Sequence, residues 1–241
     1  MIPKIIHQTW KSKEIPHHLR GFQKLWLHHH PEWEYRIWND AANESLLAEH
    51  YPDFLHYFRS TRSGILMIDF VRMAYLHRYG GVYADLDYEV IKPLDDLLGS
   101  EHVILCREHR GIGRLLRGHD YVLNALMVSP PGHPLWLDAM HGMVRAFRPR
   151  RILERRTAYF IRLGVAVLDE HAEQRSRTQG DVDILPFEVF YPASPTERLA
   201  VNRRAAAVQA SYGIHHYENS WRSPLARLVN NGRAAVQRCF R

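Results

Sequence analysis

Short hydrophobic runs alternate along the chain with longer segments in which hydrophobic residues recur at helical spacing. The short runs predict strands at 4–7, 33–38, 82–84, 102–106, 121–129, 183–185, 187–190 and 211–217. The longer segments predict helices at 17–29, at 52–59, 65–79, 134–147 and 152–168, and from Asn39 or Asp40 to about 50. Strands that alternate with helices are typical of a mainly parallel sheet covered on both faces, so the pattern predicts a single α/β domain.

The most informative part of this pattern is the end of the apolar helix at 65–79. Gly80 and Gly81 follow the helix as a C-terminal stop, and the three residues 82–84 form a short strand that leads to Asp85. In an extended segment, side chains two positions apart point to the same face, so Asp85 and Asp87 can act together. Two such carboxylates can hold Mg²⁺ or Mn²⁺ with the phosphates of a substrate, although the same pair also occurs in ordinary surface turns.

The same apolar helix contains two charged residues, Asp69 and Arg72. They are three positions apart and therefore lie on one face of the helix. Charges within an apolar helix are costly unless they are paired or used, so one interpretation is an internal ion pair. The other is that Asp69 accepts hydrogen bonds from sugar hydroxyls while Arg72 contacts a phosphate or sugar oxygen, and the two interpretations are compatible.

Four motifs follow one another along the chain: IPKIIHQTW at 2–10, the Asp69/Arg72 pair with YGGVYADLD at 79–87, KPL at 92–94, and HHYENSW at 215–221. In this order they resemble glycosyltransferase family 32, whose members carry a DXD motif, and they share a core pattern with the glucosylating domains of large clostridial toxins. The resemblance implies a GT-A-like nucleotide-diphospho-sugar transferase fold. It also implies metal-dependent, retaining transfer of a hexose or N-acetylhexosamine, an activity of EC class 2.4.

The resemblance also assigns roles to individual residues. Asp85, Asp87, Asp69 and Arg72 are expected to be catalytic, and His215 is expected to join Asp85 and Asp87 in binding Mn²⁺ or Mg²⁺. His216 points to the opposite face if this segment is a strand. Residues expected to contact substrate are Gln8, Trp10 (against the nucleotide base), Tyr83, Asn124 (on the transferred sugar), Ser220 and Trp221. For Trp10, Tyr83 and Trp221, simple packing is the alternative interpretation.

These roles lead to an expected mechanism and set of partners. The donor is a UDP- or GDP-linked sugar, and the acceptor is a glycan or a lipid-linked glycan. No carboxylate is assured as a nucleophile, so attack by the acceptor beside the departing phosphate is expected. The chain has no clear Thr-Gly-Pro element, with 162–165 standing in that region, and its 107–119 segment is rich in Arg, His and Gly. Both features leave the acceptor open.

Composition bears on the class and the expected location of the protein. The chain has 241 residues, 46% hydrophobic and 24% charged, with 32 Lys and Arg against 26 Asp and Glu and a net charge of +6. No stretch is long and apolar enough to span a membrane, no signal peptide is visible, and two cysteines do not suggest a disulfide framework. We therefore expect a cytoplasmic protein, with no nucleic-acid partner because no nucleic-acid-reading module is visible.

The C-terminal segment 225–241 is a basic amphipathic helix by its pattern. We expect it to dock on a catalytic domain formed by 1–224, and the alternative is peripheral contact with the inner membrane surface.

Two other classes of function remain open from the sequence. Asp-x-Asp after a strand also marks haloacid-dehalogenase-type phosphatases, although Tyr88 and Glu89 after the motif fit them poorly. A non-catalytic module that binds anionic ligands through its arginines is the second alternative.

Overall fold

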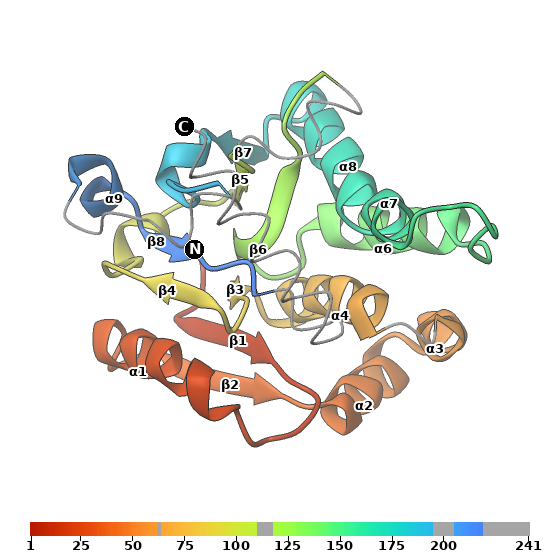
Figure 1. Cartoon of the computed structure of the whole chain (residues 1–241), viewed down its shortest axis with the longest axis horizontal. Helices are drawn as coiled ribbons and strands as arrows, with labels where there is room; N and C mark the ends of the chain where they lie inside the picture. Colours follow the sequence, from red (N-terminus) through yellow and green to blue (C-terminus); the bar gives the residue numbers. More distant parts are fainter. Residues whose placement is uncertain (62–63, 110–117, 195–204, 219–241) are drawn as a thin grey trace.

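A six-stranded mixed sheet forms the centre of the computed structural model, in the order β2-β1-β3-β6-β5-β7 (Figure 1). The structure describes residues 1–61, 64–109, 118–194 and 205–218. The strands of this sheet are β1 (Ile5–Thr9), β2 (Glu34–Trp38), β3 (Gly81–Ala84), β5 (Val103–Arg107), β6 (Val122–Ser129) and β7 (Val182–Leu185). A second, two-stranded antiparallel sheet pairs β4 (Tyr88–Val90) with β8 (Gly213–His215).

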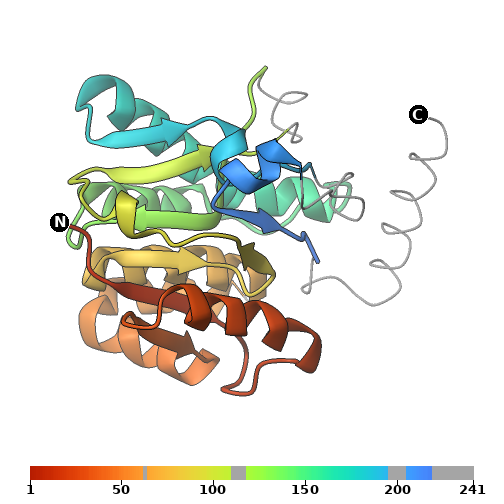
Figure 2. The same ribbon diagram turned by 90° about the vertical axis from the view of Figure 1, so that its left-hand side faces the viewer.

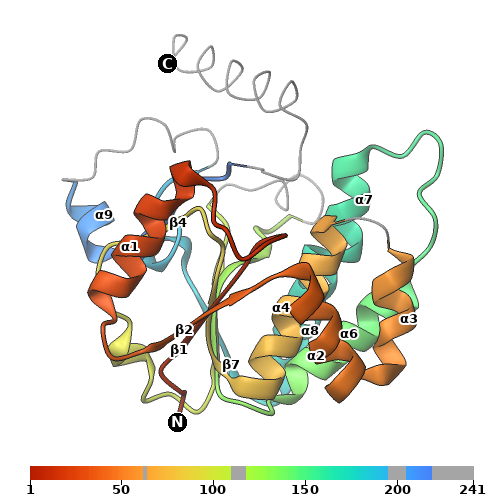
Figure 3. The same cartoon turned by 90° about the horizontal axis from the view of Figure 1, so that it is seen from below.

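Helices cover one face of the large sheet in a thick layer. Figure 3 shows α2, α3, α4, α6 and α8 together on this side and α1 on the other. The helices of the layer are α2 (Asp40–His50), α3 (Pro52–Ser60), α4 (Gly64–Tyr79), α6 (Pro134–Ala146), α7 (Arg156–Leu163) and α8 (Val165–Thr178). Their apolar side chains bury the larger core, in which Phe70, Met73 and Trp136 are inaccessible to solvent. This continuous burial explains why the α4 segment is apolar on almost every side.

The opposite face is covered by α1 and the small sheet, which Figure 2 shows in front of the larger sheet. Here lie α1 (Arg20–His29), α9 (Ala206–Ala210) and the 3₁₀ turns η1 (His17–Leu19), η2 (Asp95–Leu97) and η3 (Phe187–Val189). A second core cluster, including Trp26, Tyr88 and Tyr191, fills the space between these elements and the sheet. Trp26 also donates its indole N–H to the Tyr88 carbonyl at 3.0 Å, which fixes α1 against β4.

Strand directions bring one end of several strands to a common edge. β1 pairs in parallel with β2 and β3, and β5 pairs in parallel with β7, as the α/β pattern predicts. β6 is the exception, because it runs antiparallel to both β3 and β5. As a result, the beginning of β6 meets the carboxyl ends of β1, β3 and β5 at one edge, which is where ligands bind in open α/β sheets.

The predicted helix at 152–168 is wrong in its bounds. The structure breaks it at Gly164, between α7 and α8, and α8 continues to Thr178. A Cβ on Gly164 would lie 2.4 Å from Oδ2 of Asp69, so a residue without a side chain is required for the backbone to approach this carboxylate.

Two predicted strands are also corrected. The segment at 187–190 is a 3₁₀ turn, and the strand predicted at 211–217 is reduced to the three residues Gly213–His215. The remaining predicted elements are present within a few residues of their expected ends, and none of the described helices could cross a membrane.

Candidate active site

Asp85 lies directly after β3 and is held by both neighbouring strands. Its backbone N–H donates to the Ala125 carbonyl on β6 at 2.8 Å, and its own carbonyl accepts the side-chain amide of Gln8 on β1 at 3.2 Å. Gly81, at the start of β3, allows β3 to lie close to β1, because a Cβ at this position would lie 2.5 Å from the Ile5 carbonyl oxygen. The backbone at Asp85 is therefore fixed before any ligand binds.

The side chain of Asp85 is oriented through one of its two oxygens. Oδ1 accepts the Tyr83 hydroxyl at 2.7 Å and lies 3.3 Å from Nη1 of Arg72. The other oxygen, Oδ2, faces away from these partners and lies 3.7 Å from Nε2 of His215.

Asp87 is likewise held by the protein through one of its two carboxylate oxygens. Its Oδ2 accepts the backbone N–H of Glu218 at 2.7 Å, and its Oδ1 lies 3.4 Å from Nε2 of His215. His215 reaches this position because β8 pairs with β4 immediately after the acidic motif, with His215 opposite Tyr88. The expected divergence of the two histidines is confirmed, since His216 turns away and bonds Glu89 at 2.7 Å.

Three ligand atoms thus converge: Asp85 Oδ2, Asp87 Oδ1 and His215 Nε2. One such atom from each residue lies within 4.8 Å of the others. Carboxylate oxygens are the ligands that Mg²⁺ and Mn²⁺ prefer, and imidazole is a common ligand of transition metals. The donor set and its arrangement therefore fit Mn²⁺ or Mg²⁺, and the cluster of Asp85, Asp87 and His215 is hereafter the cation cluster.

Electrostatics in the cation cluster follow from its burial and its mixed charges. Burial raises the pKa of Asp85 against the opposing effect of Arg72. Burial acts on Asp87 in the same sense, but the charge and hydrogen bond of His215, together with backbone N–H groups that include that of Glu218, lower the pKa of Asp87 to about 2. For His215, burial lowers the pKa, yet the attraction of Asp87 and Asp85 leaves it raised. Without a metal, the two carboxylates therefore favour the protonated form of His215.

Asp69 and Arg72 of α4 form the second part of the site. Arg72 Nη2 lies 3.4 Å from Asp69 Oδ1, which confirms the internal ion pair expected from their spacing. Asn124 Nδ2 donates to the same Asp69 oxygen at 2.9 Å, and Arg72 Nη1 donates to the Asn124 carbonyl at 2.7 Å. Arg72 also lies over the Tyr83 ring, at 4.5 Å from its centre. Arg72 therefore links Asp69 to Asp85 across the sheet edge.

A cavity of about 480 Å³ opens above these residues. The predicted site residues on its wall are Trp10, Asp69, Arg72, Tyr83, Asp85, Asp87, Asn124 and His215. Gln8 is different, because it is fully buried behind Asp85 and its Oε1 accepts the Tyr35 hydroxyl. Gln8 thus positions the Asp85 backbone and does not line the cavity, while Ser220, Trp221 and the segment 225–241 lie outside the described residues.

Glu108 lines the same cavity and was not singled out by the sequence. It follows β5, and its backbone N–H donates to the Tyr121 carbonyl at 2.8 Å. Burial raises the pKa of Glu108 to about 7, with His215 opposing and Asp120 adding to the effect. An isolated Glu in a segment rich in Arg and His carries no sequence signal. Only the pairing of β5 with β6 places it at this edge.

Glu108→Gln is expected to remove a pH dependence of stability. A carboxyl with a pKa of about 7 in the folded chain and an ordinary value when unfolded stabilises the fold fully only below its unfolded pKa. Between pH 4.5 and pH 7.5, the free energy of unfolding of the wild type should therefore fall by up to about 3 kcal/mol relative to that of Glu108→Gln. Urea unfolding of both chains in EDTA measures this difference. Parallel stability curves for the two chains over that range would contradict the raised pKa.

Comparison with known proteins places this site in context. Residues 16–104 match the family described as "Glycosyltransferase sugar-binding region containing DXD motif", which confirms the resemblance drawn from the central motifs. The chain is similar to "Inositol phosphoceramide mannosyltransferase 3" of Schizosaccharomyces pombe, with 37% identity over 60% of this chain and 38% of that protein. It is also similar to the "Initiation-specific alpha-1,6-mannosyltransferase" of Candida albicans, with 31% identity over 45% of this chain and 30% of that protein.

The fold has a counterpart among solved structures. The structure described as "PaToxG Glycosyltransferase" superposes with a TM-score of 0.51 and 14% identity, over 74% of this chain and 70% of that one. This likeness confirms the predicted α/β fold of the chain, which resembles that of toxin glycosyltransferase domains. The similarity to the two yeast relatives spans less than half of the length of each of those proteins.

Proposed function

We propose that the protein, whose residues 16–104 match a glycosyltransferase sugar-binding region containing a DXD motif, transfers a sugar from a nucleotide-diphosphate donor in a metal-dependent reaction. In support, ligand atoms of Asp85, Asp87 and His215 converge on one point. The convergence of the three atoms is the observation that carries the proposal. A hexose is the proposed sugar, with mannose first because both yeast relatives are named as mannosyltransferases. The proposal includes both UDP- and GDP-linked donors.

Asp85, Asp87 and His215 would hold Mn²⁺ or Mg²⁺, and the ion would supply positive charge that offsets the negative charge of the donor diphosphate. The protein contributes by fixing one oxygen of each carboxylate. Tyr83 and Arg72 occupy Oδ1 of Asp85, and the Glu218 N–H occupies Oδ2 of Asp87. Because the remaining oxygens are already directed at one point, little reorganisation is needed when the ligand binds.

Arg72 supplies a fixed positive charge on the cavity wall. Burial opposes that charge, but Tyr83, Asp85 and Asp69 raise the pKa of Arg72 above its usual range. It stays protonated at any working pH and can stabilise negative charge that develops on a departing phosphate oxygen. Asp69 and Asn124 are paired beside it and offer oxygen and amide groups to sugar hydroxyls.

We propose that transfer retains the anomeric configuration through attack by the acceptor on the same face as the leaving phosphate. In this mechanism the phosphate accepts the proton of the acceptor hydroxyl, and no protein carboxylate forms a covalent bond. Glu108 provides a test, because it is a cavity carboxylate outside the cation cluster and the Asp69–Arg72 pair, and its pKa is near neutrality. Glu108→Gln should keep transfer within about ten-fold, whereas trapping of a glycosyl–enzyme at Glu108 would indicate double displacement.

The acceptor is proposed to be a glycan or a lipid-linked glycan. One yeast relative is named for inositol phosphoceramide and the other for initiation-specific α-1,6-mannosyl transfer, and these names support a glycolipid or glycan acceptor. The expected cytoplasmic location stays a prediction. So does the docking of segment 225–241 on the catalytic domain, with membrane contact as its alternative.

The proposed function is tested by offering nucleotide sugars with Mn²⁺. At least one GDP- or UDP-hexose should raise the unfolding temperature only when Mn²⁺ is present, because a ligand that binds only the folded chain stabilises it. Release of the nucleoside diphosphate should then require the metal and stop on addition of EDTA. Failure of every nucleotide sugar in both assays would refute the proposal. Metal-dependent hydrolysis of simple phosphomonoesters would instead favour the phosphatase alternative.

A further inference from the structure

The loop between α6 and α7 presents two hydrophobic side chains to solvent. Ile152 is 95% exposed and Leu153 is 96% exposed, at adjacent positions. Single exposed hydrophobic residues are common on protein surfaces, but two aliphatic side chains with almost no protein contact are unusual. Figure 1 shows this loop projecting beyond the helices that it joins.

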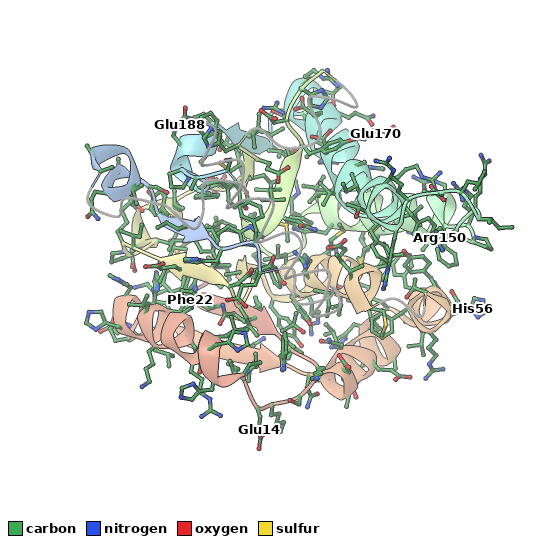
Figure 4. All side chains as sticks on the ribbon, in the orientation of Figure 1. Glu14, Phe22, His56, Arg150, Glu170 and Glu188 are labelled. Carbon is green, nitrogen blue, oxygen red and sulfur yellow. The ribbon has the colours of Figure 1, made fainter. Side chains whose placement is uncertain are left out.

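Strong positive charge surrounds this hydrophobic tip. The segment 145–162 contains seven arginines and a single acidic residue, Glu154. Six of these arginines are exposed: Arg145, Arg150, Arg151, Arg155, Arg156 and Arg162. Figure 4 labels Arg150 near the outer edge of the molecule. The segment therefore carries a net charge of +6, equal to that of the whole chain.

The loop has a defined conformation in which the acidic residue is used internally. Glu154 Oε1 pairs with Arg148 at 3.0 Å and with Arg162 at 3.3 Å, and its carbonyl accepts from Arg150 at 2.6 Å. The Tyr159 hydroxyl donates to the Arg148 carbonyl at 2.7 Å. These contacts gather the loop around Glu154 and leave its hydrophobic tip directed outward.

The position of the loop connects it to the cavity. Thr157, Phe160 and Ile161 of α7, which begins directly after the loop, line the cavity that holds the cation cluster. Phe160 also packs with Leu66 of α4 in a small hydrophobic cluster. A surface that bound the loop would therefore lie beside one wall of the cavity.

We propose that this loop docks the protein on an anionic membrane surface, with Ile152 and Leu153 inserted between the headgroups and the exposed arginines placed at lipid phosphates. Aliphatic side chains are stabilised when they leave water for the apolar part of the interface, while arginines keep their charged ends at the headgroups. Charge complementarity favours an anionic bilayer, because basic residues near such a surface are attracted individually. A nucleic acid or an acidic protein would satisfy the arginines but gives no reason for a bare aliphatic tip. The inference goes beyond sugar transfer and does not depend on it.

Vesicle binding of the full chain tests this proposal. Sedimentation with phosphatidylcholine vesicles should show weak binding, and vesicles with 30% phosphatidylserine should show clear binding that decreases with added salt. The double variant Ile152→Ser/Leu153→Ser should reduce the partition coefficient on anionic vesicles about ten-fold. Leu27→Ser is the matched control, because Leu27 of α1 is also exposed, at 43%, and lies on the other side of the sheet.

A second pair of variants tests the charge. Arg151→Glu/Arg155→Glu should reduce binding about 25-fold or more, since each arginine near an anionic surface contributes about five-fold. Lys13→Glu/Lys24→Glu changes net charge equally at two exposed positions and should have a much smaller effect. The proposal fails if the wild type does not bind anionic vesicles. It also fails if Ile152→Ser/Leu153→Ser binds as the wild type does, or if the control variants lose binding equally. Loss of RNA binding but not of vesicle binding in the arginine variant would overturn it in favour of a nucleic acid.

Discussion

Asp87→Asn is expected to lower kcat/KM for sugar transfer by about a thousand-fold, the effect typical of removing a preorganised charge from a reaction centre. The substituted side chain can still accept the Glu218 N–H, which the wild-type residue does at 2.7 Å through Oδ2. What changes is the atom that faces His215, 3.4 Å away in the wild type: an anionic oxygen becomes a neutral amide. The substitution therefore removes a metal ligand with little change of shape.

Two measurements separate this effect from a structural one. Mn²⁺ titration should show weakened metal binding by the variant, and urea unfolding in EDTA should show a chain that still folds cooperatively. Asp183→Asn is the matched control, because Asp183 on β7 also pairs with a histidine, His102, at 3.2 Å, and lies away from the cavity wall. Transfer by Asp87→Asn within ten-fold of the wild type would remove Asp87 from the site.

Much of the site could be predicted from the sequence because its signals are local. The apolar α4 segment, the glycines that end it and the acidic motif lie within one continuous stretch, and their spacing determines which faces they share. The Asp69–Arg72 ion pair follows from a helical spacing of three positions in the same way. Such relations require no knowledge of how distant segments pack.

The parts that no local pattern determines depend on contacts between distant segments, and Asn124 was expected at the site only from the family resemblance. An alternating α/β pattern predicts parallel strands, and a parallel β6 would place Asn124, near its start, at the edge opposite Asp85. The antiparallel direction of β6 brings Asn124 to Asp69 at 2.9 Å. The same pairing brings Glu108 to the cavity. Likewise, the glycine at the break between α7 and α8 is required by the closeness of Asp69, which no local pattern near Gly164 could reveal.

Arg72→Met is expected to destabilise the fold by about 3–5 kcal/mol at pH 7.5, the cost of leaving buried carboxylates without their cation. Arg72 and Asp69 are both 4% exposed, and Arg72 is also 3.3 Å from Asp85. Methionine fills a similar volume but cannot pair with either acid or donate to the Asn124 carbonyl. As a control, Arg59→Met breaks the exposed Arg59–Glu44 pair and should cost less than about 1 kcal/mol.

The pH dependence of this loss distinguishes an unpaired charge from poor packing. Burial raises the pKa of Asp69 even with Arg72 present, and Arg72 is the largest influence that opposes the rise. Without Arg72, the folded chain should favour protonated Asp69 more strongly, so its stability should fall as pH rises above the unfolded pKa and should partly recover as pH falls toward 4.5. Urea unfolding of Arg72→Met and the wild type at pH 4.5 and pH 7.5 measures the change. An equal free-energy loss at both values would mean that Arg72 acts through its packing and its hydrogen bonds to backbone carbonyls, and that the charge of Asp69 is stabilised by other groups.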